Sequence, residues 1–295
     1  MTEIFNVPLN VLLSQLTLGL VNGSFYAVLS LGLAVIFGLL NVVNFAHGAF
    51  YMMGAYGAWM LLNYAGVGYF WSLALAPVTV GLIGIIVERT LLRWVYKLDH
   101  LYGMLLTFGL SLIIEGLYRE GFGVSGEPFA VPDLLRGAAD LGFMKLPIYR
   151  AWVVAASLAI CITTWYIIER TKLGSTLRAA TENARLVQAF GVNVPVMVTL
   201  TYGCGVALSA LAGVLAVPLV QANPLMGGNI IITVFAVVVI GGMGSIFGSV
   251  VTGLALGVLE ALAKVFYPEA SSTVVFFAMV LVLLAKPAGL FGKGN

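Results

Sequence analysis

Charged side chains are scarce in this sequence, and their scarcity excludes an ordinary soluble fold. Only 9% of the 295 residues are Asp, Glu, Lys or Arg, while 61% are apolar. Soluble domains carry roughly a quarter charged residues. Most of the charges fall in a few short clusters, and the apolar stretches between them run for about 20 residues, the length of a helix that crosses a bilayer. We therefore expect lipid to be the solvent of this chain.

Other absences exclude most catalytic chemistry. The two cysteines, Cys161 and Cys204, lie within apolar runs and lack the spacing of a metal or redox site. The sequence contains no GxxxxGK[ST] phosphate loop, and no GxSxG, HExxH or paired-carboxylate arrangement of a membrane hydrolase. We expect no catalytic residue, no metal site and no cofactor in this chain. The net charge of +2 does not indicate a nucleic-acid partner.

The fold class predicted is all-α, a polytopic transmembrane helical bundle of about nine spans, within a range of eight to ten. The apolar runs that predict spans cover residues 10–38, 44–63, 72–92, 102–118, 150–168, 196–219, 229–242, 246–264 and 272–287. The first run is long enough for one tilted helix or for two pieces broken at 22–24, and the run at 229–242 is short for a crossing. No basic residue precedes the first run, which we expect to be kept rather than cleaved. We interpret 1–295 as one membrane domain.

The placement of Lys and Arg predicts the orientation, because short basic loops stay in the cytoplasm. Three segments are basic: 88–100, 169–185 and 286–293. The segments 115–150 and 260–270 mix both signs of charge and are expected outside. Nine spans satisfy these assignments with the N-terminus outside and the C-terminus in the cytoplasm.

Glycine is abundant, with 35 residues, and several glycines within the spans recur at a separation of four. The pairs are Gly19 with Gly23, Gly244 with Gly248, and Gly253 with Gly257. Such pairs let helix backbones approach closely in lipid. They indicate either tight static packing or surfaces that slide during transport, and the segment 241–245, between two spans, is the best candidate for a hinge.

Ionisable groups are almost missing from the middle of the spans, which disfavours a proton- or sodium-coupled carrier. The exception is a polar junction between the first two spans, which contains Asn41, Asn44, His47 and Gly48. In one interpretation it caps a helix, with Asn44 binding free backbone donors and His47 bonding to a carbonyl of a neighbouring helix. In the other it forms a hinge or gate beside the translocation pathway, together with the amide of Asn22. A lone histidine does not indicate a metal site.

The segment 170–195 is the most distinctive polar stretch. It predicts one amphipathic helix from Ser175 to Phe190, capped by Ser175 or Thr176 and ended by Gly191 before Pro195 begins the next span. Its apolar positions recur at helical spacing: Leu177, Ala180, Ala184, Val187 and Phe190. Such a loop is either a connector on the lipid surface or a docking helix for a cytoplasmic partner, and its regular pattern favours docking.

The segment 44–48, Asn-Phe-Ala-His-Gly, followed by Met-Gly-Ala-Tyr at 53–56, resembles the permease subunits of branched-chain amino acid ABC importers of the LivH type. The resemblance continues through 178–191 and 241–260. It implies a heterodimer with a second permease subunit, two cytoplasmic ATPases that use ATP and Mg, and an extracytoplasmic binding protein that delivers Leu, Ile or Val. We expect a multi-pass protein of a bacterial-type inner membrane, and our hypothesis for its mechanism is alternating access.

The resemblance further implies that the 170–195 loop holds the helix that couples to the ATPases. The residues carried over to that role are Arg178, Ala179, Glu182, Asn183, Ala184, Arg185 and Gly191. The sequence departs from the Glu-Ala-Ala pattern of ABC importers, because Glu-Asn-Ala stands at 182–184 and Gly191 follows Glu182 by nine positions. Permeases for urea and short-chain amides are closely similar, so these substrates are the alternative. A stand-alone secondary carrier or channel is the other class of explanation.

Overall fold

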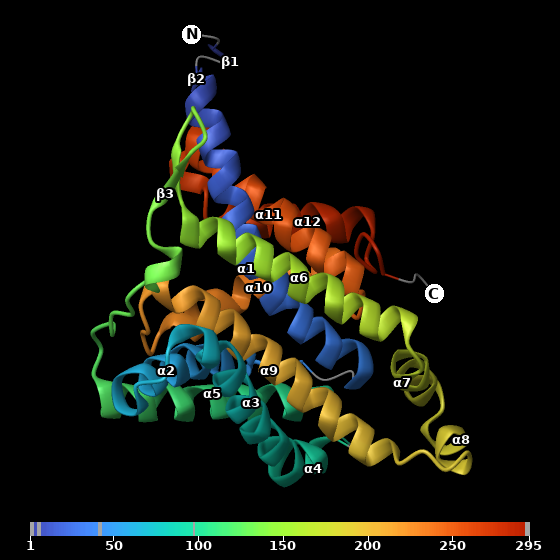
Figure 1. The fold of residues 1–295 in the computed structure, drawn as a ribbon. Helices are drawn as coiled ribbons and strands as arrows, with labels where there is room; N and C mark the ends of the chain where they lie inside the picture. Colours follow the sequence, from blue (N-terminus) through green and yellow to red (C-terminus); the bar gives the residue numbers. More distant parts are fainter. Residues whose placement is uncertain (1–2, 5–6, 41–42, 97, 293–295) are drawn as a thin grey trace. The chain divides into compact units, whose positions relative to one another are not determined.

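The computed structural model describes residues 3–4, 7–40, 43–96 and 98–292, and most of them are helical (Figure 1). The helices are α1 Leu9–Leu40, α2 His47–Ala65, α3 Tyr69–Val87, the π-helix η1 Glu88–Leu92, α4 Arg93–Val95, α5 His100–Phe122, α6 Ile148–Arg170, α7 Lys172–Glu182, α8 Ala184–Ala189, α9 Val194–Val220, α10 Met226–Gly241, α11 Ile246–Phe266 and α12 Val274–Ala285. Two short 3-10 helices are η2 Asp133–Leu135 and η3 Pro268–Ala270. The strands form two antiparallel pairs, β1 Glu3–Ile4 with β2 Val7–Pro8, and β3 Ala138–Asp140 with β4 Lys145–Pro147. The predicted all-α fold class is confirmed.

Each of the nine apolar runs coincides with a helix. Six helical stretches in the described part of the chain are long and apolar enough to cross a membrane: α1, α3 continued through α4, α5, α6, α9 and α11. Helices α10 and α12 are also apolar but shorter, with 16 and 12 residues. The chain is therefore a multi-pass membrane protein with about six long apolar helices and further shorter ones. The count of nine crossings stays a prediction.

Helix α1 is continuous through residues 22–24, so the first apolar run is one long helix and not two pieces. The Ser24 hydroxyl donates to the Val21 carbonyl at 2.7 Å, so its polar group is satisfied within its own helix. With 32 residues the helix is about 48 Å long, which exceeds the hydrocarbon thickness of about 30 Å. It must tilt or extend beyond the apolar layer.

The contacts divide the chain into two compact units. The first contains Met1–Ser30, Val131–Cys161 and Thr233–Asn295, and the second contains Leu31–Ala130 and Ile162–Ile232. Helices α1, α6 and α10 each contribute residues to both units. The prediction of a single permease domain over 1–295 stays a prediction.

In the first unit, α1 packs against α11 through small residues. A Cβ atom on Gly257 would lie 2.3 Å from the Gly23 nitrogen, and one on Gly253 would lie 2.7 Å from the Ala27 nitrogen. A Cβ on Gly19 would meet the backbone of α11 at 2.8 Å. The predicted pairs Gly19 with Gly23 and Gly253 with Gly257 are confirmed as sites of close helix approach.

The third predicted glycine pair was wrong, because Gly244 is not in a span. It lies in the turn between α10 and α11 with φ of 85°, in the left-handed region that favours glycine. Gly248 instead faces Gly241, whose carbonyl oxygen would be 2.1 Å from an added Cβ. The Ser245 hydroxyl caps α11 by accepting from the Gly248 nitrogen at 3.1 Å. The segment 241–245 does connect two apolar helices, and its role as a hinge stays a prediction.

In the second unit, α2 and α3 pack on α9 (Figure 1). A Cβ on Gly54 would lie 2.1 Å from the Ala210 carbonyl oxygen, and one on Gly213 would lie 2.0 Å from that of Tyr51. Only glycine permits these separations, because every other residue would place a carbon inside the neighbouring backbone. Helix α9 is thereby held closely against α2 around Ala210 and Gly213.

Candidate functional site

The polar junction before α2 is fixed by its amide side chain. Asn44 is fully buried, its Oδ1 accepts from the Ala46 nitrogen at 3.1 Å, and its Nδ2 donates to the Tyr202 hydroxyl of α9 at 3.0 Å. The Phe45 nitrogen donates to the Thr107 hydroxyl of α5 at 3.1 Å. Asn44 binds a backbone donor as expected, but it does not cap α2, because the N-cap of that helix is Ala46, whose side chain makes no capping bond. The junction joins α9 to α5.

His47 and Gly48 begin α2 inside the second unit. His47 is fully buried, and its backbone carbonyl accepts from the Ser209 hydroxyl of α9 at 2.7 Å. An added Cβ on Gly48 would lie 2.4 Å from the Gly227 carbonyl oxygen of α10. The structure therefore brings Asn44, His47 and Gly48 into one closely packed site. Their role in a pathway or gate stays a prediction.

The other two candidates for the pathway are Asn22 and Asn41. Asn22 lies in α1 within the first unit and is half-buried. Asn41 lies outside the described residues. Their role in a pathway or gate also stays a prediction.

A buried carboxylate, Glu88, was missed as a site residue by sequence reasoning. It is 1% exposed, it begins the π-helix η1, and it accepts from the Thr199 hydroxyl of α9 at 2.7 Å. Burial, and secondarily the neighbouring Glu88 carboxylate, raise the pKa of Tyr96 above its ordinary value. Single-turn π-helices are common at functional sites. No local signal marks Glu88, because its burial depends on α9, more than a hundred residues later.

The predicted single helix over 175–190 was wrong, because the segment forms two helices, α7 and α8. The break is at Asn183, whose backbone is extended at φ of −149° and ψ of 86°. Its side-chain oxygen accepts from the Leu186 nitrogen at 3.0 Å and so caps α8. Asparagine competes for backbone groups in this way, which favours a cap over a helix interior.

The predicted start of this helix was also wrong, whereas its end is confirmed. Helix α7 begins at Lys172, and the hydroxyls of Ser175 and Thr176 both donate to the Lys172 carbonyl instead of capping the helix. Gly191 follows α8 with φ of 84°, a left-handed conformation that terminates helices. Helix α9 then begins with Pro195 in its first turn.

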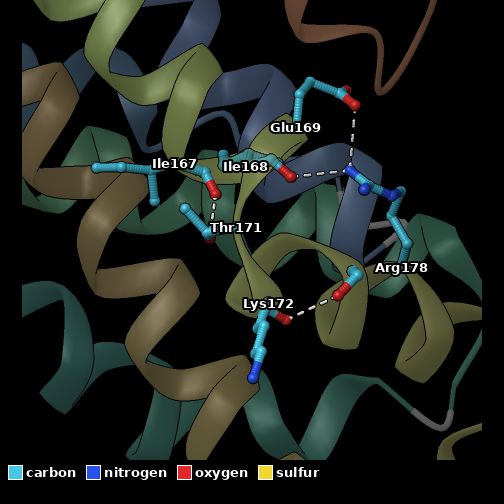
Figure 2. A network of polar contacts seen from close by, with 7 residues as sticks. Ile167, Ile168, Glu169, Thr171, Lys172 and Arg178 are labelled. Carbon is cyan, nitrogen blue, oxygen red and sulfur yellow. Dashed lines mark hydrogen bonds and ion pairs between the residues drawn. The ribbon is translucent and has the colours of Figure 1, made fainter.

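Arg178 anchors α7 to the end of α6. Its Nη1 donates to the Ile168 carbonyl oxygen at 2.8 Å and lies 3.3 Å from a Glu169 carboxylate oxygen (Figure 2). The last carbonyls of a helix have no partner inside it and attract cations. A Cβ on Gly174 would lie 1.7 Å from the same Ile168 oxygen, so only glycine allows this approach. The Thr171 hydroxyl also donates to the Ile167 carbonyl (Figure 2).

The apolar positions of the segment divide between the two helices. Leu177 and Ala180 are half-buried, and they line a space of about 30 Å³ together with Val194 and Met197 of α9. Val187 of α8 is buried as predicted. Ala184 and Phe190 are exposed, Phe190 by 80%. Of the five apolar positions predicted to share one buried face, Leu177 and Ala180 of α7 and Val187 of α8 are therefore at least half-buried, whereas Ala184 and Phe190 are not.

The remaining candidates for coupling form one exposed surface. We name it the α7–α8 surface, and it consists of Ala179, Glu182, Asn183, Ala184 and Arg185, all exposed. Within the described ranges, the side chains of Glu182 and Arg185 form no ion pair or hydrogen bond. Exposed and unpaired charges beside the exposed Leu186 and Phe190 are suited to bind another protein. Arg178 differs from them, because it holds the surface in place.

The chain is similar to known permease proteins over most of its length. A family model described as the permease component of a branched-chain amino acid transport system matches residues 15–284. The high-affinity branched-chain amino acid transport system permease protein LivH of Salmonella typhimurium is 30% identical, over 95% of this chain and 96% of that protein. The corresponding BraD of Pseudomonas aeruginosa is also 30% identical, with the same coverage. LivM of Escherichia coli is 25% identical over 90% of this chain and 67% of its own length.

The family match covers almost all of the helical chain described above, including the junction at 44–48 and the α7–α8 surface. A family model that spans so much of a chain identifies its class of protein. The chain therefore belongs to the family of branched-chain amino acid transport permeases, and it is a membrane transport subunit rather than an enzyme.

Proposed function

We propose that this chain is the permease subunit of an ATP-driven importer that moves branched-chain amino acids inward across a bacterial plasma membrane by alternating access. The choice of substrate is supported by the similarity to LivH and BraD, which extends over nearly their whole length. Family membership alone would also allow another small substrate. Leu, Ile and Val are proposed because the two relatives are both named for branched-chain amino acids.

The observation that carries the ATP-driven mechanism is the anchor of α7 on α6. Arg178 binds the end of a long apolar helix, while the surface with Glu182 and Arg185 is exposed beside it. A short helix fixed in this way moves together with α6 as a rigid element when a partner displaces its outer surface. Coupling between two sites requires such a continuous connection of packed elements. We therefore assign the contact with the ATPases to the α7–α8 surface.

The proposed assembly contains partners for each remaining task. A second permease subunit resembling LivM would complete the translocation pathway, two cytoplasmic ATPases would bind and hydrolyse ATP with Mg, and an extracytoplasmic binding protein would deliver the amino acid. The proposed orientation, with the N-terminus outside and the C-terminus inside, puts residues 170–195 in the cytoplasm. It follows from the excess of Lys and Arg in that loop.

Reconstitution tests this proposal. The chain is purified with its copurifying subunits, inserted into proteoliposomes with ATP and Mg on the ATPase side, and uptake of labelled leucine is measured. We expect uptake to require ATP, and to be inhibited by isoleucine and valine but not by urea or acetamide. Inhibition by urea or acetamide alone would reassign the substrate.

A charge exchange tests the coupling surface in the same assay. Glu182→Lys combined with Arg185→Glu should lower ATPase assembly or substrate-stimulated hydrolysis. The matched control is Glu120→Lys with Lys145→Glu, an exchange of equal charge at two exposed positions of α5 and β4. Unchanged transport in the first variant would remove Glu182 and Arg185 from the coupling role.

A further inference from the structure

A large cavity in the second unit borders the α7–α8 surface, whose Ala184 lines it, and the proposed transport mechanism assigns no role to its other lining residues. Its volume is about 880 Å³, and it lies between η1 and α4 on one side and α8 with the first turns of α9 on the other. This volume falls within the range of about 300–1,000 Å³ that is typical of sites for small molecules. The cavity is therefore large enough for a ligand rather than for a few waters.

The charge of the cavity is basic. Arg89 and Arg93, four positions apart, both line it and are exposed. Among the described residues, neither guanidinium forms an ion pair or a side-chain hydrogen bond. Glu88 also lines the cavity, but it is buried and its carboxylate binds the Thr199 hydroxyl. Two free cationic groups that present several donors are suited to bind a phosphate group.

The rest of the cavity lining is mostly apolar and lies where two long apolar helices end. The stretch from α3 through α4 ends at Val95, and α9 begins at Val194. Trp94 lines the cavity and is 77% exposed, and Val196 lines it from α9. Tryptophan is enriched at the interface between lipid and water, and basic pockets between membrane helices on the cytoplasmic side bind anionic lipid head groups.

We propose that this cavity binds an anionic phospholipid, with Arg89 and Arg93 holding the phosphate and the apolar walls contacting the acyl chains. A lipid matches both features of the lining, because its phosphate is complementary to the two arginines and its acyl chains are complementary to apolar residues such as Trp94 and Val196. Gln188 of α8 also lines the cavity. A bound lipid would thus contact the helix that carries Arg185, and the lipid composition would influence the α7–α8 surface.

Lipid binding can be measured directly on the purified assembly, independently of transport and therefore of the proposed function. The protein in neutral detergent is titrated with phosphatidylglycerol, with phosphatidylcholine of the same chain length, or with inorganic phosphate. Thermal stability and the lipids retained in native mass spectrometry are recorded. We expect phosphatidylglycerol alone to raise the melting temperature and to remain bound.

The variant Arg89→Gln with Arg93→Gln should weaken binding of phosphatidylglycerol about tenfold or more, because both cationic groups that hold the phosphate are lost. The matched control Arg136→Gln with Lys145→Gln loses the same charge at exposed positions outside the cavity and should bind normally. The variant Arg89→Lys with Arg93→Lys keeps the charge and should retain most of the binding.

Three results would overturn the proposal. They are equal binding of phosphatidylcholine, an equal effect of inorganic phosphate, or loss of the ATPases without loss of lipid in the glutamine variant. The last result would show that the two arginines bind a protein partner.

Discussion

The guanidinium of Arg178 donates a hydrogen bond of 2.8 Å to the carbonyl oxygen of Ile168, and this contact joins α7 to the end of α6. Four residues earlier in α7, Gly174 lies so close to the same oxygen that no side chain fits between them. One carbonyl of α6 therefore determines where the proposed coupling helix is held.

Replacing Arg178 with Gln should free α7 from α6. Loss of a hydrogen bond to a charged donor costs about 1–3 kcal/mol, toward the lower end here because the side chain is partly exposed. We expect faster amide exchange over 172–182 and weaker stimulation of ATP hydrolysis by substrate. Arg119→Gln, which breaks an exposed ion pair in α5, is the control and should change neither. Unaltered exchange in the Arg178 variant would show that the contact does not hold α7.

Replacing Gly174 with Ala should displace α7, because the new methyl group would lie 1.7 Å from the Ile168 oxygen. Overpacking of this kind costs about 1–3 kcal/mol. Gly109→Ala in α5 is the control, since a Cβ there meets nothing within 4 Å. Melting temperatures and amide exchange of both variants check the prediction. A Gly174 variant as stable as the control would contradict the close approach of the two helices.

The bond between Asn44 and Tyr202 should show measurable coupling in a double-mutant cycle. Tyr202→Phe removes the acceptor for the buried amide, and Asn44→Ala removes the donor together with the bond to the Ala46 nitrogen. Each single change should lower stability by about 1–2 kcal/mol, with an interaction energy of about 1 kcal/mol. Thermal unfolding of the four proteins in the cycle checks this. Strictly additive effects would mean that the two side chains do not interact.

Replacing Thr199 with Val should leave the Glu88 carboxylate buried without its hydroxyl donor. The cost of an unsatisfied buried group is about 1–3 kcal/mol. Thr181→Val is the matched control, because its hydroxyl donates only to the Arg178 carbonyl of its own helix and is exposed. We expect a lower melting temperature for the Thr199 variant alone. Equal stability of the two variants would show that Glu88 does not depend on Thr199.

The apolar runs between charges were sufficient to predict where the helices lie. Hydrophobicity over about 20 residues reflects the lipid environment directly, so all nine runs coincide with helices. A helix end marked by a glycine was also predictable, as at Gly191, which adopts the left-handed conformation that terminates helices.

Features that depend on distant contacts could not be predicted in this way. The break at Asn183 depends on whether its side chain caps α8 or remains in a continuous helix, and both are compatible with the sequence pattern. Glu88 sits among basic residues at a span end, and only the packing of α9 buries it against Thr199. Gly244 and Gly248 are four residues apart, but Gly244 lies in the turn between α10 and α11 while Gly248 lies within α11.

The most direct test of the account is uptake of labelled leucine by proteoliposomes that contain either this chain alone or the complete assembly with a second permease, ATPases and binding protein. We predict uptake only with the complete assembly and only with ATP and Mg, and a several-fold decrease when Glu182 and Arg185 exchange charge. Uptake by this chain alone, without ATPases, would contradict the account.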